Sequence, residues 1–232
     1  SGVAVTDNTK VKVSVQNRIL DASAMGRKSG ENLRLFSRVE TLPDLIQPAG
    51  DLALKLSQQV GFGGKNAAVS IGKGAELATN VGGKLSVSSD GSILLNGGLT
   101  AKAGEINLNI TPPSLTDAGF LPNQGVWLGA TAKLDVGGVS RIYQDGFGRA
   151  RGEVLDGGKI TIHADRGFIE SQAGSLMNVA GTADYLDIPV KGSNLSQSSG
   201  KQLIASAGGQ IELRAAEGMQ IMGNLQASGG GT

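Results

Sequence analysis

The sequence predicts an all-β fold: a right-handed parallel β-helix, built as a solenoid of coils of about 20–21 residues with loop insertions. Three observations predict it. Short segments alternate polar and apolar residues, paired glycines open several of these segments, and similar cassettes recur along the chain. Glycine provides 37 of the 232 residues and aromatic residues only 3%, without the every-third spacing of collagen. Many short strands joined by tight turns fit these observations.

Alternation of polar and apolar residues indicates strands with one buried face. It occurs at Val11/Val13/Val15, Leu52/Leu54/Leu56, Leu85/Val87, Ile106/Leu108/Ile110, Ile160/Ile162 and Ile211/Leu213. Within one coil we expect strands at 83–88, 92–96 and 99–103. The corners between them would be Asp90-Gly91 and Asn96-Gly97-Gly98, because Asn, Asp and Gly accept the left-handed backbone of tight turns.

The length of the repeat follows from matching cassettes. Gly83-Lys84-Leu85-Ser86-Val87 resembles Gly104-Glu105-Ile106-Asn107-Leu108, which places the two strands 21 residues apart. This register sets Lys84 beside Glu105 on the outer face, an exposed pair that contributes about 0–1 kcal/mol. Repeated along the whole chain, it predicts roughly 9 to 10 coils in a rod about 45 Å long.

A second cassette recurs three times, as Asn80-Val81-Gly82-Gly83, Asp135-Val136-Gly137-Gly138 and Asn178-Val179-Ala180-Gly181. We interpret its Asn or Asp as a corner former, its valine as core and its glycine as the residue that lets neighbouring coils approach. A calcium ladder would need a glycine-rich nonapeptide with aspartate at fixed positions, and the sequence lacks this pattern.

We expect residues 1–232 to be a single β-helix fragment, an interior piece of a longer protein. Four segments break the rhythm of the strands and are predicted to be insertions outside the helix, at about 34–47, 111–124, 140–156 and 183–199. They contain five of the six prolines, which are poorly tolerated within a ladder because proline lacks an N–H donor. In a solenoid such insertions leave at a corner and often carry binding function.

Composition argues against several classes of function. The formal charge is +1, from 21 basic and 20 acidic residues that are interspersed, so no basic face favours nucleic acid as a partner. Without cysteine there is no disulfide, thiolate zinc site or cysteine nucleophile. No apolar run is long enough for membrane insertion. The single histidine, His163, is expected on the outward face, so we predict no catalytic residue, no metal and no cofactor.

The insertion from Arg141 to Arg151 is the strongest candidate for binding a glycan or a partner protein. Arginine and aromatic side chains together stack on sugar rings and hold anionic groups. The candidate residues are Arg141, Tyr143, Phe147, Arg149 and Arg151. Against this role stands the structural interpretation that we favour, a loop that folds back and packs its aromatic side chains on the shaft.

Two further interpretations concern sugars. Trp127, between Val126 and Leu128, is expected to pack in the core, with a sugar-binding face as the alternative. Because parallel β-helices also include polysaccharide-active enzymes, paired carboxylates in the insertions stay open as catalytic candidates. These are Asp145, Glu153, Asp156, Asp184 and Asp187, which we expect to be turn formers and solvated loop residues. Their clustering in one groove with an arginine would favour the enzyme.

One stretch carries a resemblance to a family. It is Gly157-Gly158-Lys159-Ile160-Thr161-Ile162-His163-Ala164-Asp165-Arg166-Gly167, followed by Ala173-Gly174-Ser175-Leu176-Met177-Asn178-Val179-Ala180-Gly181-Thr182. It resembles the repeats of filamentous haemagglutinin family proteins, the large exoproteins of two-partner secretion. A Gly-Ser-x-x-Asp-Val-Ser-Gly signature is common in that family, and here Asn178 replaces the aspartate and Ala180 the serine.

The resemblance implies a secreted protein of the bacterial cell surface, exported with an outer-membrane two-partner secretion transporter as its partner. Its implied role is that of an adhesin in adhesion, biofilm formation or contact with host cells, a virulence function, with a glycan or a cell-surface protein as receptor. The Asn-Pro-Asn-Gly and Asn-Pro-Asn-Leu elements of the family's secretion domain are absent, which favours a shaft segment. A passive spacer that displays a toxin or an adhesive tip is a further alternative.

Overall fold

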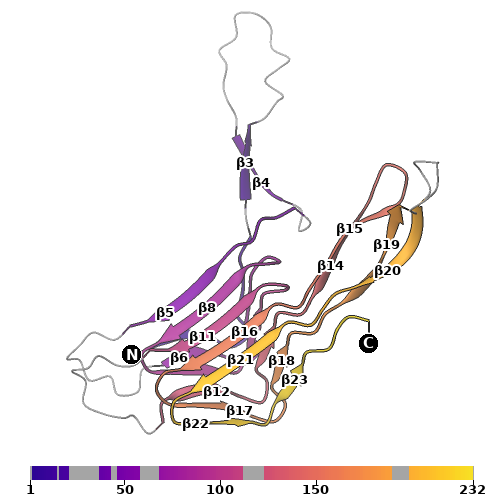
Figure 1. Cartoon of the computed structure of the whole chain (residues 1–232). Helices are drawn as coiled ribbons and strands as arrows, with labels where there is room; N and C mark the ends of the chain where they lie inside the picture. The colour runs from indigo at the N-terminus through magenta and orange to yellow at the C-terminus, as the bar shows by residue number, and fades with distance from the viewer. Residues whose placement is uncertain are drawn as a thin grey trace, which may run out of the picture.

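The computed structural model describes residues 2–14, 16–20, 37–42, 46–57, 68–111, 123–189 and 199–231. Within these ranges the chain forms strands and turns, and no helix. Most strands lie in three parallel sheets, and the others form three antiparallel hairpins (Figure 1). The prediction of an all-β chain with parallel strand pairing is therefore confirmed.

The three parallel sheets are named here by their order in the chain. The first sheet contains β1 (Val3–Val5), β6 (Ala68–Ile71), β9 (Ser92–Leu95), β12 (Gly125–Leu128), β17 (Phe168–Ser171) and β22 (Gly218–Ile221). The second contains β2 (Lys10–Lys12), β7 (Glu76–Ala78), β10 (Gly98–Thr100), β13 (Lys133–Asp135), β18 (Leu176–Asn178) and β23 (Asn224–Gln226). The third contains β5 (Leu52–Leu56), β8 (Lys84–Ser89), β11 (Glu105–Ile110), β16 (Lys159–Ala164) and β21 (Gln210–Ala215).

The chain visits the three sheets in strict rotation. Strands β6, β7 and β8 belong to the first, second and third sheets, and β9, β10 and β11 repeat the sequence one layer further along. Each inner strand pairs in parallel with its equivalents in the layers before and after it. This arrangement is compatible with a solenoid. The strands expected at 83–88, 92–96 and 99–103 correspond to β8, β9 and β10.

The 21-residue register is confirmed where it was read. Lys84 pairs with Glu105, and the Lys84 Nζ and Glu105 Oε2 atoms lie 3.2 Å apart on the outer face. In other layers, paired residues are much further apart in the sequence, since Glu105 pairs with Lys159 and Lys159 with Gln210. Fixed strand register and variable connections therefore coexist in this chain.

The prediction of 9 to 10 coils is wrong. Among the described residues, the first and second sheets each contain 6 strands and the third contains 5. At a spacing of about 4.8 Å between strands, such a stack is roughly 24 Å long. Much of the chain lies in hairpins and other connections outside the sheets, so dividing its length by one repeat overestimated the layers.

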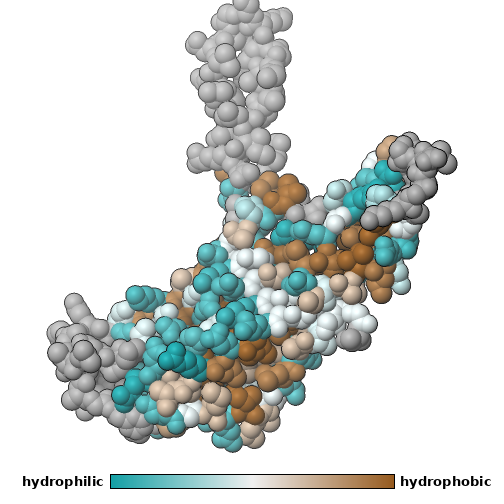
Figure 2. Space-filling model, viewed as in Figure 1, coloured by the Kyte–Doolittle hydropathy of each residue, from teal (hydrophilic) through white to brown (hydrophobic). Residues whose placement is uncertain are grey.

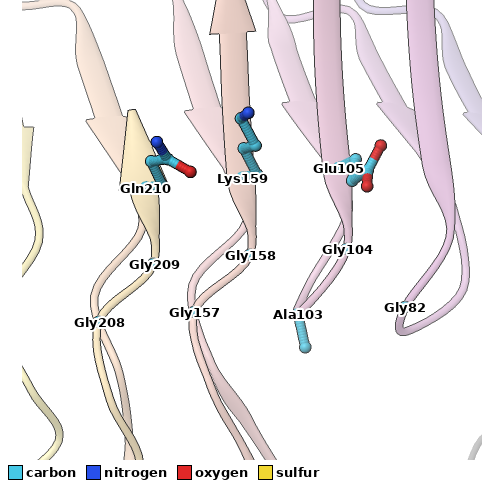
Figure 3. A pocket seen from close by; sticks show the side chains of 10 residues that line it. All are labelled: Gly82, Ala103, Gly104, Glu105, Gly157, Gly158, Lys159, Gly208, Gly209 and Gln210. Atoms are coloured by element: carbon cyan, nitrogen blue, oxygen red, sulfur yellow. The ribbon is translucent and has the colours of Figure 1, made fainter. Parts of the chain in front are cut away.

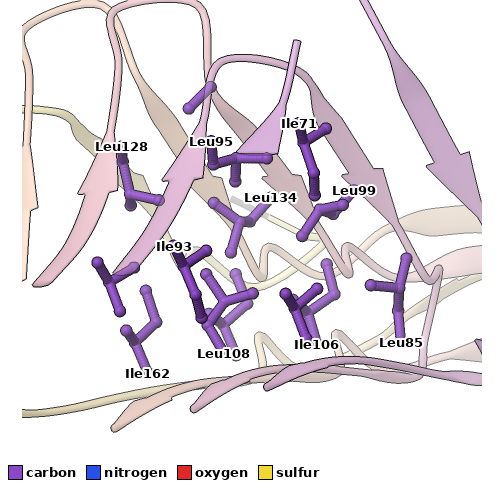
Figure 4. Close-up of a cluster of buried hydrophobic side chains, with 14 of the residues drawn as sticks. Ile71, Leu85, Ile93, Leu95, Leu99, Ile106, Leu108, Leu128, Leu134 and Ile162 are labelled. Atoms are coloured by element: carbon purple, nitrogen blue, oxygen red, sulfur yellow. The ribbon is translucent and has the colours of Figure 1, made fainter. Parts of the chain in front are cut away.

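Apolar side chains of all three sheets fill the interior of the stack (Figure 4). The alternating residues form rows across layers, such as Leu85, Ile106 and Ile160 in the third sheet, all with 0% exposure. Side chains such as Ile93 and Leu108 point into this interior from different sheets. Burying each leucine or isoleucine contributes about 1.5–3 kcal/mol, which makes these rows the main source of stability.

Glycines form a ladder where the chain enters the third sheet. A Cβ atom on Gly104 would strike the Gly83 carbonyl oxygen, one on Gly158 the Gly104 oxygen, and one on Gly209 the Gly158 oxygen. The same carbonyl groups accept hydrogen bonds from the next layer, for example from Lys159 N to Gly104 O at 2.9 Å. Figure 3 shows Gly104, Gly158 and Gly209 side by side in successive layers. The paired glycines of the sequence cassettes are therefore required for close stacking.

The Asn or Asp cassette is only partly in register. Asp135 pairs with Asn178, and the valines that follow them are fully buried, as predicted. Asn80 is not equivalent to them, because Thr100, which pairs with Asp135, pairs on its other side with Ala78. Val81 is accordingly only half-buried. The mismatch arises because the first cassette runs directly into β8, whereas the other two precede hairpins.

The three antiparallel hairpins leave the stack at one corner. They are β3 (Gln16–Leu20) with β4 (Ser37–Thr41), β14 (Val139–Gln144) with β15 (Ala150–Leu155), and β19 (Ala183–Pro189) with β20 (Ser199–Ala205). Each follows a strand of the second sheet and precedes a strand of the third. Figure 1 shows all three on the same side of the stack.

The predicted insertions differ from these hairpins in their limits. The segment predicted at 34–47 contains β4, but the excursion already includes β3 at Gln16. The one predicted at 140–156 coincides with β14 and β15, and the one at 183–199 extends through β20 to Ala205. Residues 112–122 of the segment at 111–124 lie outside the described residues. The sequences of β3, QNRIL, and β20, SGKQLIA, have no regular alternation that would mark them as strands.

Candidate functional site

The predicted binding residues lie on the hairpin of β14 and β15. The two strands pair antiparallel, with Arg141 opposite Glu153 and Tyr143 opposite Arg151. The chain reverses between Asp145 and Arg149, where the Asp145 N–H donates to the Arg149 carbonyl oxygen at 3.0 Å. All five predicted residues thus belong to one hairpin.

Asp145 organises the tip of this hairpin. Its carboxylate accepts hydrogen bonds from the N–H groups of Phe147 and Arg149, at 2.9 and 3.1 Å. Arg149 Nε lies 2.7 Å and Arg151 Nε 3.4 Å from Asp145 Oδ2. Desolvation acts to raise the pKa of Asp145, but these donors outweigh it and hold the pKa well below its usual range. Arg149 and Arg151 are therefore both engaged by Asp145.

Asp187 links this hairpin to that of β19 and β20. Its Oδ2 atom accepts a hydrogen bond from the Ala150 N–H at 2.7 Å, and its carbonyl oxygen accepts one from Arg151. On the second hairpin Lys201 Nζ lies over the Tyr185 ring, 5.4 Å from its centre. The two hairpins consequently form a pair, and Figure 2 shows hydrophobic surface gathered over it.

Arg141 points toward the stack. Its side chain is 17% exposed, its guanidinium donates to the Val81 carbonyl oxygen at 3.4 Å, and it lies 3.6 Å from Glu153. Arg141 and Tyr143 line a groove of about 490 Å³ together with Ile46, Gly152 and Glu153. Nothing in the sequence indicates that Ile46 belongs to this groove. Ile46 follows β4, a strand of a different hairpin, and no local pattern relates it to the hairpin of β14 and β15.

The aromatic side chains of the hairpin face solvent. Tyr143 is 49% and Phe147 76% exposed, and the Arg149 guanidinium carbon lies 4.7 Å from the centre of the Phe147 ring. The expectation that this loop packs its aromatic side chains on the shaft is therefore wrong for both residues. On this hairpin, the groove near Arg141 and the exposed tip at Phe147 are surfaces available for a partner.

The carboxylates considered for catalysis are distributed along the two hairpins. Of the five, only Glu153 lines the groove. Asp156 accepts a hydrogen bond from Ala207 N–H at 2.8 Å, and Asp184 accepts one from Tyr185 N–H at 2.8 Å. Asp145 and Asp187 bind the donors described above. Among the described residues, no group of three or more histidine, aspartate and glutamate side chains is arranged to hold a metal ion.

Two other single residues were considered from the sequence. His163 lies on the third sheet with its side chain 30% exposed, and its Nε2 atom is 2.9 Å from Glu212 Oε1. The expectation that Trp127 packs in the core is wrong, because Val126 and Leu128 point inward and Trp127 between them points outward. The alternation of a strand decides this, since neighbouring side chains lie on opposite faces.

Scans against protein-family models, curated proteins and solved structures each found no match to this chain. The resemblance to filamentous haemagglutinin family repeats thus stays a prediction from the sequence cassettes. In the part of the chain that the structure describes, no helix is long and apolar enough to cross a membrane.

Proposed function

We propose that this chain is a shaft segment of a large secreted bacterial surface adhesin, folded as a right-handed parallel β-helix. Strict rotation of the chain among three parallel sheets supports the β-helix, because each layer then contacts only its neighbours. A stack held by ladders of hydrogen bonds and rows of buried side chains resists bending, which suits a shaft. The repeat cassettes support the adhesin family and export through a two-partner secretion transporter.

The single observation that carries a binding role is the position of the hairpins. All three described hairpins leave the stack between the second and third sheets, so the shaft presents them together. Exposed Tyr143 and Phe147 lie on one of them. Large apolar side chains held in solvent on a rigid support are typical of a contact surface for a partner. We propose a glycan or cell-surface protein as this partner, and a non-catalytic role for the chain.

Binding of the purified chain to cultured host cells and to a glycan array tests this function. Replacing both Tyr143 and Phe147 by alanine is expected to weaken binding at least about tenfold, since exposed aromatic anchors dominate such contacts. Tyr185→Ala is the matched control, because Tyr185 is 50% exposed on the neighbouring hairpin. Equal binding by the double variant would contradict the assignment to this hairpin, and absence of any binding would favour the passive spacer.

Export is tested separately, on intact cells that produce the native protein and its transporter. Antibodies against this segment are expected to label the cell surface, and deletion of the transporter gene is expected to abolish the labelling. Labelling only after the cells are permeabilised would contradict a surface adhesin. This outcome is independent of which receptor the hairpins bind.

A further inference from the structure

The outer face of the first sheet has an aromatic surface near β12, away from the hairpins. Trp127 points outward there and is partly exposed. A Cβ atom on Gly125 would lie 3.1 and 3.2 Å from the Cε2 and Cζ2 atoms of the indole, so the ring extends over Gly125. The missing side chain at Gly125 lets the indole lie against the sheet, which leaves its other side toward solvent.

Phe168 continues this surface on the next strand. It pairs with Gly125 on one side and Gly218 on the other, so no side chain flanks it in its row. A Cβ atom on Gly218 would lie 3.4 Å from Phe168 Cδ1, so the ring reaches Gly218. Trp127, Phe168, Gly218 and Met219 line a groove of about 420 Å³. The glycines hollow the surface and the aromatic rings line it.

Polar side chains border the same groove. Trp127 pairs with Glu170 and Glu170 with Gln220, so an indole, a carboxylate and an amide follow one another in one outward row. Among the described residues, the Glu170 side chain has no hydrogen-bond or ion-pair partner, and no lysine or arginine lines the groove. The groove therefore combines flat apolar surface with polar groups and a negative charge.

We propose that this groove binds a neutral saccharide, with one pyranose ring stacked on Trp127. A pyranose presents C–H groups on its faces and hydroxyl groups around its rim, and aromatic rings beside polar side chains complement both. Glu170 and Gln220 hydrogen-bond to the hydroxyl groups. The carboxylate of Glu170 repels uronic acids, which selects neutral sugars. The row from Trp127 through Glu170 to Gln220 crosses three layers, with about 4.8 Å between neighbours. A saccharide chain lies along this row.

Trp127 is the only tryptophan of the chain, so intrinsic fluorescence reports this site directly. The whole chain is titrated with cellohexaose and mannohexaose, which represent microbial polysaccharide, with a lactosamine oligosaccharide, which represents host glycans, and with polygalacturonate. At least one neutral oligosaccharide is expected to shift the emission to shorter wavelength and to saturate. The oligosaccharide that responds shows whether the ligand is a microbial polysaccharide or a host glycan.

Calorimetry then compares variants with the responding sugar. Trp127→Ala and Phe168→Ala are each expected to weaken binding at least about tenfold, while Tyr185→Ala, an exposed aromatic residue outside this groove, binds normally. The core residues Val126 and Ile169 are unchanged, and melting followed by circular dichroism checks the fold of each variant. The proposal is overturned if no neutral sugar alters the emission at millimolar concentration, if polygalacturonate alone binds, or if folded Trp127→Ala binds as wild type. If the double Tyr143 and Phe147 variant loses receptor binding, the proposed hairpin surface is affected, but the groove at Trp127 is not.

Discussion

At the scale of single residues, the glycine ladder leaves no room for a side chain. The Gly158 Cα faces the Gly104 carbonyl oxygen, which accepts the hydrogen bond from Lys159 N and cannot move away without loss of that bond. Gly146, at the tip of the hairpin of β14 and β15, has open space around it, since a Cβ atom there would meet nothing within 4 Å. Gly146 therefore has room for a side chain, whereas Gly158 has none.

Gly158→Ala is therefore expected to lower the free energy of unfolding by about 1–3 kcal/mol, as overpacking typically does. Gly146→Ala is the control and is expected to change it very little. Urea unfolding followed by circular dichroism measures both. A Gly158→Ala variant as stable as wild type would show that the layers can separate at this corner at no cost.

Asp135 is a second residue with a defined energetic role. Burial acts to raise its pKa, but the Lys102 ammonium at 2.7 Å, the Gly137 N–H and the charge of Lys133 outweigh burial and lower it below the ordinary 3.8. Asn178 Nδ2 also donates to Asp135 Oδ1 at 3.0 Å. A carboxylate with a lowered folded pKa stabilises the fold above the ordinary value, and this stabilisation is lost as pH falls through the folded pKa.

Asp135→Asn is consequently expected to cost about 1–2 kcal/mol at pH 7, since a hydrogen bond to a charged group is lost. The difference from wild type should shrink as the pH is lowered below 3.8. Urea midpoints measured at several pH values check this, with the exposed Asp165→Asn as control. A difference that is independent of pH would exclude the ionised carboxylate as the cause.

At the scale of elements, the two paired hairpins depend on one another through Asp187. Asp187→Ala removes the acceptor of the Ala150 N–H and is expected to speed hydrogen exchange of that amide by about tenfold. The midpoint of global unfolding should hardly change, because the core rows lie elsewhere. Exchange measured by nuclear magnetic resonance tests this.

Asp184→Ala is the matched control for that comparison. The Asp184 carboxylate accepts a hydrogen bond from the neighbouring Tyr185 N–H, so its loss should leave Ala150 unaffected. Equal exchange rates at Ala150 in both variants would mean that the hairpins are held together without Asp187.

The sequence predicted elements better than their arrangement. Alternation located β8, β9, β10 and β11, and the cassettes gave the correct pairing of Lys84 with Glu105. It could not find the hairpin strands, because strands such as β14 and β15 do not alternate buried and exposed residues as the stacked strands do. It also could not show that Asp145 engages Arg149 and Arg151, or that Asp187 reaches Ala150, since such contacts depend on how the chain reverses and which hairpins meet.

At the scale of the whole molecule, stability should vary along the stack. Inner strands such as β8, β11 and β12 have partners on both sides, whereas β1 and β22 end the described first sheet. Near the second end, Met219 and Leu225 are each 51% exposed although their rows are buried elsewhere. Layers that contact only their neighbours lose about half of their interactions at an end.

Hydrogen exchange followed by mass spectrometry is accordingly expected to show slowest exchange in β8, β11 and β12 and fastest exchange in β1, β2, β22 and β23. The profile should rise and fall smoothly across the layers. Uniform protection along the chain would contradict independent layers and would indicate a single cooperative unit.

The corner that carries the hairpins has a practical consequence. From β7 to β8 the chain passes it in a few residues, between Ala78 and Lys84, whereas from β2 to β5 it includes a whole hairpin between Lys12 and Leu52. The strands before these connections, β2 and β7, pair with each other, and so do the strands after them, β5 and β8. The length of the connection therefore does not disturb the pairing. A foreign peptide grafted into the short connection should therefore be displayed beside the native hairpins, and this chain is suited to serve as a scaffold for ordered arrays of epitopes.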